Sequence, residues 1–590
     1  MNSEIPNRNG FWAGLIVEEL VRLSCTMFFI SPGSRSSDLV AAIGRHFKTR
    51  TCVHYDERGS AFAALGYSRK SSSPAVWVTT SGTALANGLP AVIEASIDSV
   101  PLVLLTADRP PELRDTGANQ TIHQPGLFGD YVRWHFDMPT PSEEVDPSFV
   151  LSTVDQSVYR ATSERGPVHL NCMFREPLAT ETPAFESARS DVRLSRWNSS
   201  EKPYTQYIKA DRVSGTADLS EIKEALGQAT RPICVLGRLA DTRYAEPALK
   251  WAEQSGIPIL PDITSGFRLG RTEKSLIPYY DLLTNSERFN RLMKPDAVVQ
   301  VGRTPVSKRI QQFLTLSRPE TYVLVVDGPE RQDPNHLVSH RMDLNHSGVE
   351  SLFSGMKPVS DVEEGWLAGW REGSNQIEKW LRVRFGDSSE SALSEQGVAH
   401  RLCSLLPESH QFMIASSLPI RHVDTFSSSE GNPVGIVANR GVSGIDGTIA
   451  TAAGSQWSSG ERTTVLLGDL AMLHDLNSLV LAKDRGLILV VINNDGGGIF
   501  SYLPIQNQAD IFERFFATPH GMNFEHAASL FGIEYHAPED LNQFSDDYLS
   551  ALGRRGATLI EVKTDRDETK AFGDQLLEEA RSVLSENAEH

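Results

Sequence analysis

The sequence predicts an α/β protein built from three doubly wound, mostly parallel sheets. Short apolar runs alternate with helical stretches along almost the whole chain, for example Ala75–Thr79, Leu102–Thr106, Ala297–Val301 and Leu487–Ile492. Uninterrupted apolar strands separated by helices are typical of parallel sheets that are covered on both faces. With 590 residues, and at about 150 residues per domain, the chain has room for several such units.

Two polar segments divide the chain into its predicted units. Residues 179–218 are rich in Ser, Thr, Glu and Pro, and residues 356–365 together with the polar stretch 385–395 form the second boundary. The first and third units share a plan, with glycine-rich turns at the carboxyl ends of strands. The charged segment 565–590 is expected to be a surface helix. We therefore predict domains over residues 1–185, 205–355 and 390–570.

Composition and charge exclude several classes of protein. The net charge is −19, which argues against a nucleic-acid-binding or anionic-membrane surface. No apolar run is long enough to span a bilayer, and no signal peptide is visible at the amino terminus. The 5 cysteines are scattered without a Cys-x-x-Cys pair, which disfavours a disulfide framework or zinc site and favours a cytoplasmic location.

A strand–helix–strand unit spans residues 463–500. A strand ending at Leu467 is followed by Gly468-Asp469, a helix is predicted over Leu470–Lys483, and the next strand runs into Asn493-Asn494. The crossover of such a unit is right-handed. Asp469 and Asn494 are therefore expected at the carboxyl ends of neighbouring strands, where open α/β sheets bind their ligands.

The residue types at this edge predict a metal and phosphate site. A carboxylate, an amide oxygen and a backbone carbonyl suit a hard cation such as Mg²⁺ or Ca²⁺. The glycines at 496–498 allow the backbone to approach a bulky anion. Each half taken alone is better interpreted as a helix N-cap or an ordinary loop. Their separation of 25 residues favours the metal site.

Cationic and hydrogen-bonding side chains follow predicted strands in four further segments. Arginine at such positions binds carboxylates through two parallel hydrogen bonds. Each arginine by itself could equally form a structural ion pair, but together the four segments favour an anion-binding pocket in an acidic protein. The side chains are Ser34, Arg35, Arg109, Asn119, Gln120, Ser417, Arg421 and Arg440.

Gly468-Asp469 followed by Asn493-Asn494 resembles the metal and diphosphate motif of thiamine diphosphate (ThDP) enzymes. The position after the aspartate is usually Gly or Ala in that superfamily, whereas this chain has Leu470. Gly-Asp-Leu combined with Asn-Asn-x-Gly-Gly-x-Ile-Phe is similar to the branch that makes 2-succinyl-5-enolpyruvyl-6-hydroxy-3-cyclohexene-1-carboxylate (SEPHCHC). The four cationic segments resemble the same branch, so the resemblance covers essentially the whole chain, the middle unit more loosely.

The resemblance implies the cofactor site. Thiamine diphosphate with Mg²⁺ or Mn²⁺ would be held by Asp469, Asn494 and the carbonyl of Gly496. Glu57, which follows a short strand and begins a helix, matches the carboxylate that activates the aminopyrimidine ring of the cofactor. In isolation Glu57 would read as a helix-start carboxylate. The further cofactor contacts implied are Ser81, Gly468, Ile445, Ile499 and Phe500, with Ile445 as the bulky residue under the bent cofactor.

The resemblance also implies the substrate pocket. It places there the eight residues named above, together with Lys308 from the middle unit and Leu503 from the apolar wall. An exposed loop lysine and plain core packing are the alternatives for Lys308 and Leu503. The implied reaction is decarboxylation of 2-oxoglutarate and 1,4-addition of the resulting succinic semialdehyde carbanion to isochorismate, in menaquinone or phylloquinone biosynthesis.

Two rival functions remain open at this level. Another ThDP enzyme, such as an acetolactate synthase or a 2-oxoacid decarboxylase, would share the cofactor motif. Simple decarboxylases often carry a His-His pair, and the 16 histidines include no adjacent pair. A non-catalytic protein of the same fold would not be expected to keep Glu57, Asp469 and Asn494. Because Glu57 and Asp469 belong to different units and the family joins them between chains, a homodimer or homotetramer is predicted.

Overall fold

The computed structural model describes residues 8–586 except 72, 180–193, 209–218, 344–348, 351, 354–355 and 387–391. Most of the predicted linker 179–218, and part of the second predicted boundary, therefore lie outside the described residues. The chain forms two compact units. The first comprises Met1–Lys209, Asn439–Gly460 and His474–Arg485, and the second comprises Ala210–Ala438, Glu461–Leu473 and Gly486–His590.

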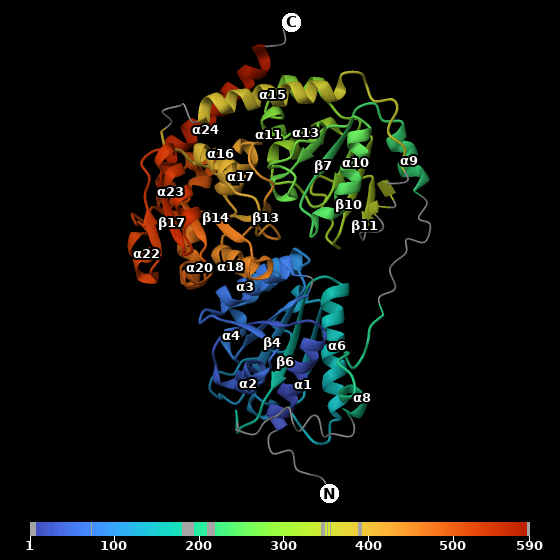
Figure 1. Cartoon of the computed structure of the whole chain (residues 1–590), viewed down its shortest axis with the longest axis vertical. Helices are drawn as coiled ribbons and strands as arrows, with labels where there is room; N and C mark the ends of the chain where they lie inside the picture. Colours follow the sequence, from blue (N-terminus) through green and yellow to red (C-terminus); the bar gives the residue numbers. More distant parts are fainter. Residues whose placement is uncertain are drawn as a thin grey trace. The chain divides into compact units, whose positions relative to one another are not determined.

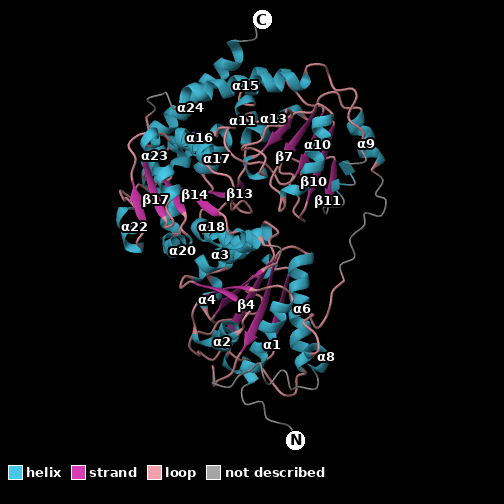
Figure 2. Ribbon diagram, viewed as in Figure 1, coloured by secondary structure: helices cyan, strands magenta, loops and turns pink. Residues whose placement is uncertain are grey.

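Three sheets carry the fold, and every pairing between the named strands is parallel (Figure 2). This confirms the predicted α/β class. In sheet order the first has β2 (Arg50–Val53), β1 (Met27–Ile30), β3 (Ala75–Thr79), β4 (Leu102–Asp108), β6 (Pro167–Met173) and β5 (Trp134–Met138). The second has β11 (His340–Asp343), β10 (Thr321–Val326), β9 (Ala297–Val301), β7 (Pro232–Leu236) and β8 (Ile259–Pro261). The third has β13 (Gly435–Val437), β12 (His410–Ile414), β14 (Arg462–Gly468), β15 (Ile488–Asn493), β17 (Thr558–Lys563) and β16 (Glu534–His536).

The first and third sheets have the same topology. Reading each from its first edge, the strands occur in the sequence order second, first, third, fourth, sixth and fifth. The similarity of the first and third units that the glycine-rich turns predict is thus seen in their strand order. In both sheets the fourth position carries a fully buried apolar strand, β4 in one and β15 in the other.

The first unit packs helices against both faces of its sheet (Figure 1). Alternate strand residues such as Phe28, Val76 and Val103 belong to one core with α1 and α6. The helix α3 begins at Glu57 because the Asp56 side chain accepts hydrogen bonds from the backbone N–H groups of the first turn. The helices of this unit are α1 (Arg8–Arg22), α2 (Ser37–Arg45), α3 (Glu57–Lys70), α4 (Thr83–Ala86), α5 (Leu89–Ile97), α6 (Pro147–Ser163), α8 (Ser195–Asn198), α18 (Thr448–Ser459) and α20 (Leu479–Arg485).

Helices α3 and α18 lie in close contact within the first unit. A Cβ at Gly66 would lie 2.0 Å from the carbonyl oxygen of Thr451, and one at Gly454 would lie 1.9 Å from that of Ala63. Glycine at these two positions therefore allows the two helix backbones to touch. Through this contact α18, which lies late in the sequence, packs directly against the helix that begins with Glu57.

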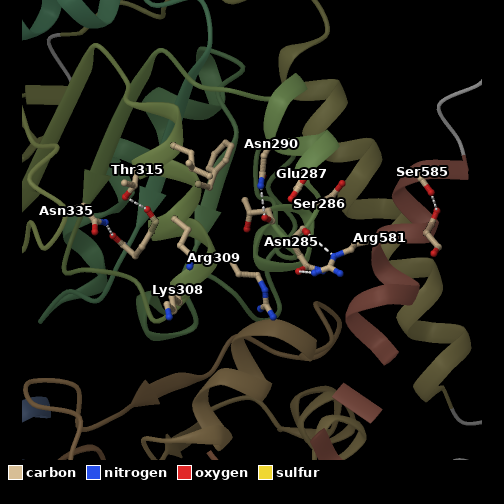
Figure 3. Close-up of a pocket in the computed structure, with 16 residues that line it drawn as sticks. Asn285, Ser286, Glu287, Asn290, Lys308, Arg309, Thr315, Asn335, Arg581 and Ser585 are labelled. Carbon is tan, nitrogen blue, oxygen red and sulfur yellow. Dashed lines mark hydrogen bonds between the residues drawn. The ribbon is translucent and has the colours of Figure 1, made fainter. Parts of the chain in front are cut away.

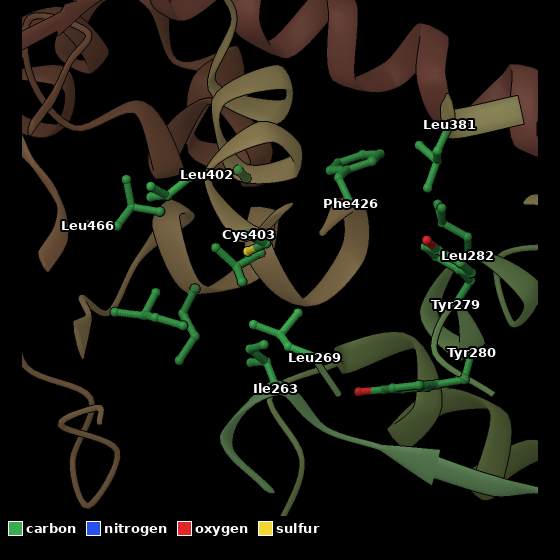
Figure 4. Close-up of a cluster of buried hydrophobic side chains, with 14 of the residues drawn as sticks. Ile263, Leu269, Tyr279, Tyr280, Leu282, Leu381, Leu402, Cys403, Phe426 and Leu466 are labelled. Carbon is green, nitrogen blue, oxygen red and sulfur yellow. The ribbon is translucent and has the colours of Figure 1, made fainter. Parts of the chain in front are cut away.

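The second unit has one continuous apolar core that joins its two sheets (Figure 4). Tyr280 and Leu282 from the central sheet's side meet Phe426, Leu402 and other residues from the third sheet's side. Its helices are α9 (Ser220–Gly227), α10 (Glu246–Gln254), α11 (Tyr280–Leu283), α12 (Glu287–Leu292), α13 (Lys308–Ser317), α15 (Trp366–Phe385), α16 (Glu395–Leu405), α17 (Leu418–Phe426), α19 (Asp469–His474), α21 (Ala509–Phe512), α22 (Glu525–Phe531), α23 (Leu541–Gly553) and α24 (Arg566–Glu586). The last of these is the helix expected near the carboxyl terminus.

The helix predicted over Leu470–Lys483 is wrong as a single element. It is divided into α19, which ends at His474, and α20, which begins at Leu479. Between them the buried side chain of Asp475 accepts hydrogen bonds from the N–H groups of Ile449 (2.7 Å) and Ala450 (3.0 Å) at the start of α18. Burial raises the pKa of Asp475 to about 6. The helix breaks because this tertiary contact replaces local hydrogen bonding.

Among the described residues, none of the helices combines the length and the apolar character that crossing a membrane requires. All five cysteines are buried and unpaired.

Candidate cofactor and substrate site

The two halves of the metal motif meet at the carboxyl ends of β14 and β15. These strands are paired, with Gly468 opposite Ile492. Asp469 begins α19 directly after β14, and its carboxylate is buried. Its Oδ2 accepts a hydrogen bond from the N–H of Gly496 at 2.8 Å, and its Oδ1 accepts one from Leu470 at 2.7 Å. The carboxylate is thus fixed beside the glycine-rich loop.

His520 is a partner of this carboxylate that the sequence analysis missed. Its Nδ1 accepts a hydrogen bond from the N–H of Met522 at 3.0 Å, so the proton lies on Nε2. That nitrogen donates to Asp469 Oδ2 at 3.2 Å. Burial raises the pKa of Asp469, and the hydrogen bonds from Gly496 and His520 oppose the rise. No motif pointed to His520, because it lies 51 residues beyond Asp469.

Asn494 presents an amide oxygen that the fold leaves unsatisfied. Its Nδ2 donates to Glu395 Oε1 at 2.8 Å, whereas its buried Oδ1 has no hydrogen-bond partner among the described residues. Buried polar atoms are rarely orphaned in this way. The described residues contain no group of three or more His, Cys, Asp or Glu that could hold a metal ion, so a cation here would also take amide and carbonyl oxygens. A carboxylate and an orphaned amide oxygen that follow paired strands at one sheet edge fit Mg²⁺ or Mn²⁺.

The glycine loop after β15 has a shape that only glycine allows. Gly496 has φ +127°, and a Cβ there would lie 2.0 Å from the carbonyl oxygen of Ala517. A Cβ at Gly498 would lie 2.6 Å from Asn494 Nδ2. Ile499 and Phe500 follow, both half-buried, and the Phe500 ring packs edge-on against Phe516 with centroids 5.7 Å apart. Leu503 is 43% exposed, which suits a side chain at the wall of an open site.

The amino terminus of α17 lies beside this loop. Leu418 Cδ1 is 3.3 Å from where a Cβ of Gly498 would be. Ser417 precedes α17 with φ +79°, and Arg421 donates from Nη1 to its carbonyl oxygen. The exposed guanidinium of Arg421 is therefore held at the same end of the sheet as Asn494.

Lys308 occupies a different hollow of the second unit. It lines a pocket of about 1060 Å³ together with Arg309 and Arg581, as Figure 3 shows. None of the other predicted site residues lines this pocket. One link to α17 exists nonetheless, because the Asp281 carboxylate accepts hydrogen bonds from Ser307, Arg309 and Thr425 at 2.5, 2.6 and 2.8 Å.

The first unit brings four predicted residues together beyond β1, β3 and β4. Arg109 Nη1 donates to Ser81 Oγ at 2.9 Å, and Ser81 Oγ donates to the carbonyl oxygen of Gln120 at 3.1 Å. Gln120 returns a hydrogen bond from Nε2 to the carbonyl of Ser81 at 3.1 Å. Arg35 is buried nearby and donates to the carbonyl of Phe174 at 2.9 Å. Burial and the charge of Arg35 lower the pKa of Arg109, whereas Glu176, which pairs with Arg35 at 3.3 Å, opposes this.

Glu57 and its neighbour Asp56 have separate roles in the structure. Asp56 accepts hydrogen bonds from Arg58 N–H at 2.9 Å and from Asn477 Nδ2 at 3.0 Å, so it serves the helix start. Glu57 is half-buried, and its Oε2 accepts a hydrogen bond from Asn87 Nδ2 at 3.2 Å. Asp56 is therefore the residue that caps α3, and the Glu57 carboxylate has no part in capping.

The remaining predicted residues lie on loops of the first unit. Ser34 and Asn119 are exposed, and Arg440 and Ile445 are half-buried in the segment that leads into α18. The structure thus forms two sets. One, with Glu57, Arg35, Ser81 and Arg109, lies in the first unit, and the other, with Asp469, Asn494 and Arg421, lies in the second.

Comparison with known proteins identifies relatives along the entire length. A family model described as "Thiamine pyrophosphate enzyme, N-terminal TPP binding domain" matches residues 12–127, and one described as "Middle domain of thiamine pyrophosphate" matches residues 189–414. A protein of Rubrobacter xylanophilus named 2-succinyl-5-enolpyruvyl-6-hydroxy-3-cyclohexene-1-carboxylate synthase is 49% identical, over 98% of this chain and 99% of its own. Proteins of the same name from Salinibacter ruber (43% identical, 97% of each chain) and Chlorobium phaeobacteroides (38%, 99% of each chain) also match.

A solved structure shares the fold at low sequence identity. The thiamine diphosphate-dependent 4-hydroxybenzoylformate decarboxylase of Rhodococcus jostii RHA1 matches with a TM-score of 0.69 and 16% identity, over 94% of this chain and 99% of that chain. The three-sheet architecture of this chain is therefore shared with that enzyme.

Proposed function

We propose that this chain, which belongs to the SEPHCHC synthase family, decarboxylates 2-oxoglutarate and joins the remaining four-carbon unit to isochorismate by 1,4-addition. The observation that carries the proposal is a buried Asp469 carboxylate and an Asn494 Oδ1 without a hydrogen-bond partner among the described residues, which follow two paired strands at one edge of a parallel sheet. The product would serve menaquinone or phylloquinone biosynthesis.

The cofactor assignment rests on the chemistry of these donors. Asp469, Asn494 and the carbonyl of Gly496 would hold Mg²⁺ or Mn²⁺ against the diphosphate of thiamine diphosphate. Gly468, Ile499 and Phe500 would line the cofactor on this side, and Ile445 and Ser81 on the pyrimidine side. Bound thiamine diphosphate supplies the electron sink that decarboxylation of a 2-oxoacid requires.

Glu57 would act as the proton-handling carboxylate. A carboxylate hydrogen-bonded to N1′ of an aminopyrimidine shifts its tautomer and makes the exocyclic nitrogen basic. The hydrogen bond from Asn87 holds one oxygen of Glu57 in place and leaves the other for this role. The capping of α3 by Asp56 relieves Glu57 of a structural function.

The arginines would bind and orient the substrate carboxylates. Arg35 and Arg109, with Ser81 and Gln120, form a confined cationic cluster, and Ser417 and Arg421 offer a second one. Ser34, Asn119, Arg440 and Leu503 are further proposed substrate contacts, and Lys308, which lines a separate pocket of the second unit, is assigned to the substrate by the resemblance alone. Fixed positive charges position polyanionic substrates for reaction, and they bind such substrates more strongly than substrates with a single carboxylate.

The proposed assembly and location follow from the same resemblance. We propose a homodimer or homotetramer, and an active monomer at assay concentration, measured by sedimentation, would refute it. The buried, unpaired state of all five cysteines supports a cytoplasmic location, because thiols stay reduced there.

The deciding experiment measures CO₂ release with thiamine diphosphate and Mg²⁺. We expect fast release only when 2-oxoglutarate and isochorismate are both present, with matching loss of isochorismate. Turnover of pyruvate would instead place the chain with acetolactate synthases or decarboxylases. A protein that binds the cofactor and turns over none of these substrates would contradict the proposal.

A further inference from the structure

The two ends of the Asn494 amide lie in different surroundings. Its Nδ2 donates to Glu395 Oε1 at 2.8 Å, and its Oδ1 is buried with no hydrogen-bond partner among the described residues. An ionised carboxylate accepts hydrogen bonds and donates none. Glu395 therefore selects the NH₂ end of the amide, and the oxygen is the end that is left for a ligand.

Glu395 is itself fixed by the third sheet and its helices. It is the first residue of α16, and its carboxylate is only 2% exposed. Its Oε2 lies 3.3 Å from Nε2 of His422 on α17, and Thr564 Oγ1 donates to its Oε1 at 3.3 Å. A buried carboxylate held from three elements has little freedom to rotate.

The neighbouring asparagine provides a contrast within the same loop. Asn493 Nδ2 donates to the buried carboxylate of Glu561 at 2.6 Å. Its Oδ1 is also satisfied, because it accepts a hydrogen bond from Asp495 N–H at 3.2 Å. The side-chain amide of each asparagine thus donates to a buried glutamate. Of the two, only Asn494 has an amide oxygen without a hydrogen-bond partner among the described residues.

We propose that Glu395 is a positioning residue for the divalent cation, acting through the side-chain amide of Asn494. This inference rests on the proposed function, because it assumes that Asn494 Oδ1 is a cation ligand. Residues that hydrogen-bond to metal ligands commonly fix the orientation of those ligands. Their loss typically weakens metal binding by about 10–100-fold.

The test uses binding of Mn²⁺ to the full-length protein with saturating thiamine diphosphate, followed by electron paramagnetic resonance. Glu395→Leu should weaken Mn²⁺ affinity by about 10–100-fold. Glu395→Gln keeps an acceptor for Asn494 and should bind Mn²⁺ within about 3-fold of the wild type. Glu561→Leu is the matched control, since it removes an equally buried carboxylate behind Asn493, and its Mn²⁺ affinity should match the wild type.

A second pair of variants keeps the inference testable if Glu395→Leu fails to fold. Asn494→Asp would bring two carboxylates to 2.8 Å, which disfavours the ionised form of one of them. Adding Glu395→Gln restores a donor to the pair and should recover Mn²⁺ affinity at least about 10-fold.

Three outcomes would overturn the inference. They are unchanged affinity in folded Glu395→Leu, equal weakening in Glu561→Leu, and no recovery in the double variant. Failure of the wild type to bind Mn²⁺ with thiamine diphosphate would instead overturn the proposed function, and the inference with it.

Discussion

Asp469 and Gly496 are 27 residues apart in the chain, yet Asp469 Oδ2 accepts a hydrogen bond from the N–H of Gly496 at 2.8 Å. The contact arises because Asp469 follows β14, Gly496 follows β15, and the two strands are paired in parallel. Parallel pairing brings the carboxyl ends of both strands to one edge. The hydrogen bond fixes the glycine loop against the carboxylate.

Replacing Gly496 should disrupt this edge. In Gly496→Ala the new Cβ would lie 2.0 Å from the carbonyl oxygen of Ala517, at φ +127°, a conformation that L-residues rarely adopt. We expect the affinity for thiamine diphosphate with Mg²⁺ to fall at least about 10-fold, measured by quenching of intrinsic fluorescence. Gly553→Ala, where no heavy atom lies within 4 Å, is the control and should bind the cofactor normally. Normal binding by Gly496→Ala would contradict the assignment.

Glu57→Gln should abolish most turnover while preserving the fold. Loss of a positioned proton-transfer group typically lowers kcat by about 10²–10⁴-fold, whereas cofactor affinity should change little. Asp56→Ala is the control, because it removes the cap of α3 and should cost about 0.5–2 kcal/mol of stability without a matching loss of kcat. Rates from CO₂ release and melting temperatures separate the two effects. If the kcat of Glu57→Gln equals that of the wild type, another residue carries the role.

Arg421→Ala should weaken substrate binding more than cofactor binding. A hydrogen bond to a charged group contributes about 1.5–3 kcal/mol, so KM for a carboxylated substrate should rise about 10–100-fold. The exposed Arg382 pairs with Glu378 and Glu430 on another surface, so Arg382→Ala should leave KM unchanged. An effect of Arg421→Ala confined to thiamine diphosphate affinity would show that its place in the substrate pocket is wrong.

A buried acid pair in the first unit predicts a pH dependence of stability. Glu19 accepts hydrogen bonds from Trp197 Nε1 at 2.5 Å and Tyr204 N–H at 2.6 Å. Burial and the neighbouring Asp155 raise the pKa of Glu19 to about 9. The folded state keeps a proton that the unfolded chain releases, so this stabilisation is complete below the unfolded pKa and is lost as the pH rises through about 9.

Glu19→Gln should remove this loss of folding stability at alkaline pH. The melting temperature of the variant should exceed that of the wild type increasingly from about pH 6 to pH 9. Glu18→Gln is the control beside it. Burial raises the pKa of Glu18, but hydrogen bonds from His46 and Arg22 outweigh this and lower it, so its contribution fades only as the pH falls. A constant difference between Glu19→Gln and the wild type across this range would contradict the raised pKa.

Buried strands were the elements best predicted from sequence. Ala75–Thr79 and Ala297–Val301 are β3 and β9 with the predicted bounds, because strands covered on both faces must be apolar throughout. Edge strands such as β5 and β16 escaped notice, since they are only half-buried and carry mixed side chains. The break between α19 and α20 also escaped, because it depends on the contact of Asp475 with α18.

The fold class, the family and the meeting of Asp469 with the loop after Asn494 were predictable from the order of residues, because they depend on local patterns and on the rule that parallel strands align their ends. Only the tertiary structure revealed that Glu395 and His520 stand behind the two proposed metal ligands. Neither lies near its partner in the chain, and each is brought there by packing of separate helices and loops. Such contacts leave no periodic signal in the sequence, so they become visible only when the chain is folded.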